Sequence, residues 1–159
     1  MWFDNVGFEL NPDDYVLCLS GDYAYTLQQI RKLSQRDEGS FIRYMVTLTC
    51  KSTVSTYNVI SLKGLGLTPD TIKRETVGQR GYDVFGNAIN VGDKVLYLHR
   101  MEIFTEIGVV TKLAAKTCIF DIKLNRFNQS SYKKPYGEII SLTALGLDET
   151  IIKKETRSF

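Results

Sequence analysis

The sequence predicts a mainly β protein built from two tandem copies of a small antiparallel barrel, each copy ending in a short helix. Three observations predict this fold class. A unit of about 80 residues occurs twice, apolar and polar residues alternate along much of each unit, and the strands are short and closely spaced. A unit of this size is too small for a sandwich, which favours a small barrel.

The repeat is visible when the sequence is placed on itself. Residues 59–76 match residues 139–156 at ten of eighteen positions, with a shift of 80. Seven further positions, from Asp4 to Leu19, match positions from Asp83 to Leu98 with a shift of 79. Because two separate regions share nearly the same shift, we assign a first barrel to residues 1–78 and a second to residues 79–159.

The strands follow from the alternation of apolar residues. In the first copy we expect strands at 16–19, 27–32, 44–50 and 59–62, and in the second at 95–98, 107–112, 118–124 and 139–142. Tyr44, Val46, Leu48 and Cys50 form one apolar face, and Cys118, Phe120, Ile122 and Leu124 form the equivalent face.

A short helix is expected at the end of each copy. Thr68 is a suitable N-cap, Pro69 suits the first helical position, and Asp70 complements the positive helix N-terminus. Asp148 and Glu149 occupy the corresponding places in the second copy. These helices would cover an end of each barrel.

The rare residues argue against an enzyme and against a metal site. The chain has one histidine, His99, and three widely spaced cysteines, which we expect to pack as small apolar residues. Asp14 and Asp93 are expected to accept backbone N–H bonds in turns and not to form a catalytic pair. We therefore predict no catalytic residues, no metal and no cofactor.

The hydropathy pattern predicts a cytoplasmic protein without a membrane partner. No stretch approaches the roughly 20 apolar residues that cross a bilayer. The N-terminus lacks the basic and apolar regions of a secretory signal, so a reducing compartment is expected.

Residues 90–97 (NVGDKVLY) and 106–112 (EIGVVTK) resemble the opening of an SH3-like barrel of the KOW or Tudor type. Gly92 would permit a tight turn and Gly108 a sharply bent strand. The first copy has Asp13 and Gln28 at these places and departs from the pattern. The two-barrel organisation is also similar to a DNA-binding early protein of T-even phages. That resemblance implies a place in the host-cell cytoplasm or nucleoid, a role in transcription or nucleoid organisation, and a host protein partner.

Charge separates the two copies. Residues 1–79 carry eight Lys or Arg and nine Asp or Glu, whereas residues 80–159 carry twelve and nine. Within 112–134 there are six cations and a single acidic residue, Asp121. A predicted loop at 125–139 is longer than its counterpart at 51–59 and is polar, basic and aromatic together. The alternative is that these lysines only keep exposed strands and loops soluble.

We predict a non-enzymatic protein that binds double-stranded DNA largely independently of sequence, mainly through the second barrel. The phosphates would be contacted by cations, with two tyrosines against sugars or bases. The predicted nucleic-acid-binding residues are Lys112, Lys116, Lys123, Arg126, Tyr132, Lys133, Lys134 and Tyr136. The alternative is a protein-interaction module that binds a peptide or host protein, with Tyr97, Phe104 and Phe120 forming an aromatic cage.

Overall fold

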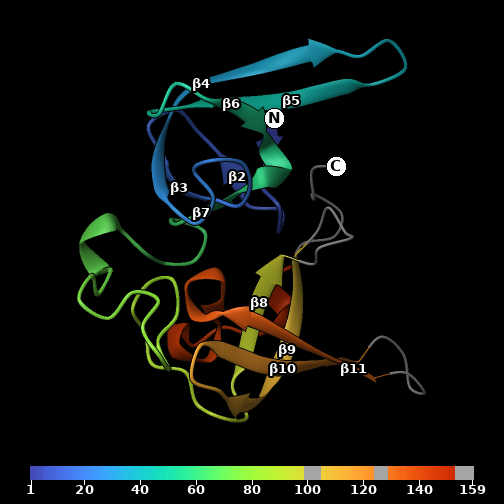
Figure 1. The fold of residues 1–159 in the computed structure, drawn as a ribbon. Helices are drawn as coiled ribbons and strands as arrows, with labels where there is room; N and C mark the ends of the chain where they lie inside the picture. Colours follow the sequence, from blue (N-terminus) through green and yellow to red (C-terminus); the bar gives the residue numbers. More distant parts are fainter. Residues whose placement is uncertain (99–104, 124–128, 153–159) are drawn as a thin grey trace. The chain divides into compact units, whose positions relative to one another are not determined.

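The computed structural model describes residues 1–98, 105–123 and 129–152, and these residues divide into two compact units (Figure 1). One unit is formed mainly by residues 1–71, and the other by residues 72–98, 105–123 and 129–150. All regular structure in the described residues consists of β-strands and three-residue 3-10 helices. The prediction of a mainly β protein is confirmed.

The first unit contains a five-stranded antiparallel sheet with the strand order β6-β5-β4-β3-β7. A two-stranded sheet of β1 (Trp2–Phe3) and β2 (Glu9–Leu10) precedes it. The five strands are β3 (Tyr15–Cys18), β4 (Leu27–Asp37), β5 (Ile42–Leu48), β6 (Thr53–Ser55) and β7 (Val59–Ser61). The 3-10 helix η1 (Thr56–Asn58) joins β6 to β7.

The second unit repeats this topology in the strand order β11-β10-β9-β8-β12. Its strands are β8 (Lys94–Leu98), β9 (Thr105–Leu113), β10 (Thr117–Lys123), β11 (Gln129–Pro135) and β12 (Ile140–Ser141). The 3-10 helices η3 (Tyr136–Glu138) and η4 (Thr143–Leu145) flank β12. The two Ile-Ser-Leu segments lie on the equivalent strands β7 and β12, as the sequence repeat predicted.

The structure differs from the prediction at the sheet edges and at the expected helices. Each sheet is open, because no pairing joins its first and last strands in the described residues. The expected helices are reduced to the 3-10 helices η2 (Pro69–Thr71) and η5 (Glu149–Ile151). The capping residues are present, but the Lys73 N–H donates to the Phe85 carbonyl oxygen at 2.9 Å instead of extending the η2 turn.

The predicted alternation places the core correctly. Val46 and Leu48 of β5 are fully buried, and Cys118, Phe120 and Ile122 of β10 are buried in the same way. The core of the first unit is made by Leu10, Val16, Cys18, Ile30, Val46, Leu48 and Val59. The core of the second is made by Ile89, Val95, Tyr97, Val110, Cys118, Phe120, Ile122, Tyr136 and Ile139. Two of the three cysteines are buried as small apolar residues, whereas His99 and Leu124 lie outside the described residues.

Each unit also holds a buried aspartate at an equivalent position. One Asp4 carboxylate oxygen accepts the N–H groups of Val6, Gly7 and Phe8 at 2.8–3.0 Å, and the other accepts the Ser61 N–H at 2.7 Å. These bonds tie the turn before β2 to β7. Asp83 does the same in the second unit: it accepts the N–H groups of Phe85 and Asn87 on one oxygen and that of Ser141, in β12, on the other.

Candidate nucleic-acid interface

A row of residues across β9, β10 and β11 carries two of the predicted lysines. Ile119 in β10 pairs with Lys112 on one side and with Lys133 on the other. Directly paired residues share a face, so these three lie on the face opposite the buried Phe120. Neighbouring strands lie about 4.8 Å apart, so the two lysine backbones are about 10 Å apart. That span is about three base-pair steps of duplex DNA.

Two further lysines lie at the same end of these three strands. Lys116 is exposed in the turn between β9 and β10, which is closed by the Ala114 N–H donating to the Thr117 carbonyl oxygen at 3.0 Å. Lys134 is half-buried and pairs with the buried Cys118 at the beginning of β10, so it lies at this end of the sheet but on the opposite face from Lys112 and Lys133. Four cations therefore gather where β9 ends, β10 begins and β11 ends.

These lysines are not neutralised by nearby acids. Among the described residues, Lys112, Lys116, Lys133 and Lys134 form no salt bridge. The nearest acid in this segment, Asp121, lies two residues beyond Ile119 on the same face, about 7 Å further along the strand. The four lysines at this end of the sheet are therefore not held in salt bridges with described residues.

Arg80 joins this end of the sheet, although the sequence analysis did not select it. Burial raises the pKa of Tyr136, the Cys118 thiol adds to this effect, and the cation of Arg80 opposes it. Geometry places a neighbour of Arg80 here: a Cβ on Gly78, two residues before Arg80, would lie 3.4 Å from the Cα of Gly137, the residue after Tyr136. The Tyr136 hydroxyl donates to the Ala114 carbonyl oxygen in the β9–β10 turn. Arg80 is 36 residues before Lys116 in the chain, so only the tertiary fold brings it here.

The two predicted tyrosines are placed differently from the lysines. Tyr132 lies in β11 opposite Phe120, on the core face, and its half-buried ring stacks on Phe120 with a centroid distance of 6.2 Å. Tyr136 is only 2% exposed and belongs to the core. The expected stacking of Tyr136 on a base is therefore corrected: burial makes its ring a core side chain, and its hydroxyl is bonded within the unit.

The predicted loop at 125–139 is also corrected, because residues 129–135 form strand β11 and residues 136–138 form η3. The strand was missed because two of its three inward positions, Ser130 and Lys134, are polar, so its apolar alternation is weak, while its backbone pairs with β10 along its whole length. Lys123 ends β10, and no side-chain placement is described for it. Arg126 lies outside the described residues.

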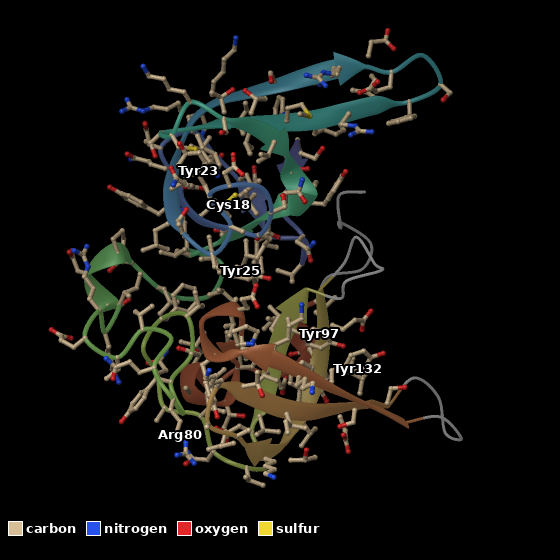
Figure 2. All side chains as sticks on the ribbon, viewed as in Figure 1. Cys18, Tyr23, Tyr25, Arg80, Tyr97 and Tyr132 are labelled. Atoms are coloured by element: carbon tan, nitrogen blue, oxygen red, sulfur yellow. The ribbon has the colours of Figure 1, made fainter. Side chains whose placement is uncertain are left out.

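The proposed members of an aromatic cage form part of the core. The rings of Tyr97 and Phe120 are 4.5 Å apart between centroids, and the two residues are 2% and 0% exposed. Figure 2 shows Tyr97 and Tyr132 in the second unit. Their ring centroids are 6.0 Å apart. Phe104 lies outside the described residues. The described members are therefore too deeply buried to enclose a ligand.

The turn chemistry of the repeated aspartates is as predicted. An Asp14 carboxylate oxygen accepts the Asn11 N–H at 2.9 Å, and an Asp93 oxygen accepts the Asn90 N–H at 2.8 Å. Within the described parts of the chain, no three His, Cys, Asp or Glu side chains are grouped to hold a metal ion. The described helices are all too short to cross a bilayer.

Comparison with protein families gives a match over part of the chain. Residues 82–142 match a family described as a domain of unknown function, DUF7205. The matched segment begins one residue before Asp83, includes strands β8 to β12, and covers less than half of the chain. No curated protein matches the chain.

Proposed function

We propose that the protein is a non-enzymatic DNA-binding protein that contacts duplex phosphates through the basic end of its second sheet. This basic end consists of Arg80, Lys112, Lys116, Lys133 and Lys134. The observation that carries the proposal is the pair of Lys112 and Lys133 on either side of Ile119, neither of which forms a salt bridge with a described residue. Lysines without a salt-bridge partner can bind the phosphates of DNA favourably, because binding releases the counterions that surround the duplex.

The proposed binding is largely independent of sequence. The described residues include no α-helix that could enter the major groove, and lysines contact phosphates as point charges without reading base edges. An interaction module with an aromatic cage is less well supported, because Tyr97 and Phe120 are buried.

The proposal extends to the fold and the setting of the protein. The shared strand order supports two SH3-like units of the KOW or Tudor type, at residues 1–78 and 79–159. In the second unit the close approach of Gly108 to Phe120 supports it as well. By resemblance, we place the protein with phage DNA-binding proteins that act in the host-cell cytoplasm or nucleoid. There it would modulate transcription or nucleoid organisation together with a host protein.

The test is a salt titration of duplex binding, measured by fluorescence anisotropy, for the parent and for the double variant Lys112→Gln with Lys133→Gln. Each lost phosphate contact should reduce the log–log salt slope by about 0.9, so the double variant should lose about 1.8. The matched control is Lys51→Gln with Lys63→Gln, which removes two exposed lysines of the first unit. Parental affinity and slope in the Lys112 and Lys133 variant would contradict the proposal.

A parallel series with duplex RNA and single-stranded DNA tests which nucleic acid is preferred. Duplex DNA should bind most tightly. Tighter binding of a single strand would contradict the duplex proposal, because a flat row of lysines without exposed aromatic rings lacks a stacking platform.

A further inference from the structure

The hairpin of β4 and β5 in the first unit extends beyond the rest of its sheet (Figure 1). β3 pairs with β4 only at residues 27–29, and β6 pairs with β5 only at residues 45–47. From the pair of Gln35 and Tyr44 to the pair of Asp37 and Ile42, the two strands therefore pair only with each other in the described structure. We call residues 35–44 the arm. Its three residue pairs extend about 10 Å before the turn.

The arm is fixed at its base and at its tip. At the base, the Trp2 indole N–H donates to the Ser34 carbonyl oxygen at 2.9 Å, and the Trp2 ring meets Tyr44 edge to face at 5.7 Å between centroids. At the tip, the Glu38 N–H donates to the Phe41 carbonyl oxygen at 3.0 Å. These contacts give the arm a defined shape before any partner binds.

The arm carries two arginines directly opposite each other. Arg36 pairs with Arg43 in the register of β4 and β5, so both side chains lie on one face. Like charges in this position repel each other. Arg43 has a salt bridge to Glu38 at 3.5 Å, whereas Arg36 is exposed and forms no salt bridge with any described residue. An anion bound between the two would relieve the repulsion.

Apolar side chains occupy the tip beside these cations. Phe41 is 50% exposed and Ile42 is 52% exposed. The Arg43 guanidinium lies 5.7 Å from the centre of the Phe41 ring. An apolar wedge next to arginines is the combination with which proteins enter the minor groove, where arginine is drawn by the negative potential and the wedge unstacks a base step.

We propose that the arm inserts into the minor groove of duplex DNA and bends it, with Arg36 and Arg43 between the phosphate strands and Phe41 and Ile42 against a base step. This inference rests on the proposed duplex binding and gives the first unit a contact of its own. A protein partner would account for the exposed Phe41 and Ile42, but not for the paired arginines. The arm also carries Asp37 and Glu38, and Glu38 is paired with Arg43, so the argument for DNA rests on the exposed Arg36 opposite Arg43 and not on the net charge of the arm.

The wedge is tested with the double variant Phe41→Ser with Ile42→Ser and a duplex of about 30 base pairs labelled at both ends for energy transfer. Parent protein should shorten the distance between the ends, and the variant should lose this bend while its salt slope stays parental. Tyr23→Ser is the control, since it removes another exposed aromatic residue from the same unit. A parental bend in the tip variant would overturn the proposal and leave the tip as a surface for a protein partner.

The arginine pair is tested with Arg36→Gln, measured for both DNA affinity and thermal midpoint. The salt slope should fall by about 0.9, while the midpoint should stay the same or rise because a repulsion is removed. A lower midpoint with parental DNA binding would overturn the proposal, because Arg36 would then have a structural role.

The Lys112 and Lys133 variant separates this inference from the function on which it rests. Loss of binding in that variant, with parental binding in Arg36→Gln, would overturn the arm alone. Loss in Arg36→Gln with parental binding in the Lys112 and Lys133 variant would uphold the arm and overturn the basic end as the DNA contact.

Discussion

The buried carboxylate of Asp4 should make the protein less stable as the pH rises from 4 to 7. Burial raises the pKa of Asp4 to about 7, against four backbone N–H bonds that lower it. In the unfolded chain the pKa returns to about 3.8. Between these values the folded state therefore holds a proton that the unfolded state has released, and each rise in pH favours unfolding.

The size of the effect follows from the two pKa values. A factor of ten in protonation corresponds to about 1.4 kcal/mol, so the interval from 3.8 to about 7 corresponds to about 4 kcal/mol. This contribution is fully present below about pH 4 and is lost as the pH rises through about 7. Burial also raises the pKa of Asp83, so the second unit should respond in the same direction.

The perturbation is Asp4→Asn, with urea unfolding measured at several pH values between 4 and 8. The Asn oxygen can keep the bonds from residues 6–8, but its amide group would face the Ser61 N–H, and that lost bond costs about 1–3 kcal/mol at any pH. The variant should be less stable than the parent at pH 4 and more stable at pH 8. Asp14→Asn, with one N–H bond in a more exposed turn, is the control.

If the free energy of unfolding of Asp4→Asn falls further below that of the parent as the pH rises, this reasoning is refuted. It would mean that the four N–H bonds outweigh burial and hold the carboxylate ionised throughout. Comparing the two proteins at each pH removes the contribution of other titrating groups, such as Asp148 and Glu149, whose pKa values are lowered by the bonds to Thr150 and Lys94, respectively.

Three further substitutions test the packing of the second unit by urea unfolding. Gly108→Ala should destabilise by about 1–3 kcal/mol, because its new Cβ would lie 2.6 Å from the Phe120 ring inside the sheet. Tyr136→Phe should cost about 1 kcal/mol through loss of the bond to the Ala114 carbonyl oxygen. Lys94→Ala should leave the unfolding midpoint unchanged, since its salt bridge is solvent-exposed and screened. A neutral Gly108 variant or a strongly destabilised Lys94 variant would contradict this account.

The sequence predicted the parts of the fold that depend on alternation and repetition. Val59–Ser61 and Ile140–Ser141 fall on equivalent strands because the shift of 80 preserves both their sequence and their pairing with β3 and β8. The core faces of β5 and β10 were found because every second residue is apolar. Both signals are local, and the tertiary structure did not override them.

The missed features depend on partners that are distant in sequence or on polar strands. β11 has Ser130 and Lys134 on the face that meets the core, so only its pairing with β10 identifies it as a strand. β4 was expected to end at Lys32 but continues to Asp37, because cross-strand bonds to β5 support a polar stretch. The role of Asp4 could not be read from the sequence, since its fourth N–H bond comes from Ser61. Arg80 likewise reaches the basic end only through the fold.

The two units share their scaffold but differ in the hairpin that carries charge, which argues for separate roles in binding. Both keep the buried aspartate before the sheet, and both use the serine of β7 or β12 to accept a backbone N–H three residues later, from Gly64 or Ala144. In the first unit the β4–β5 hairpin is long, with 11 residues in β4. In the second unit the long strand is β11, which has seven residues, whereas its counterpart β6 in the first unit has three. A narrow arm suits a groove, and a flat row of lysines suits phosphates along the backbone. Under the two proposals the surfaces would contact different parts of a duplex, and their loss should be distinguishable: the tip variant of the arm should lose bending at a parental salt slope, and the lysine variant should lose salt dependence without losing bending.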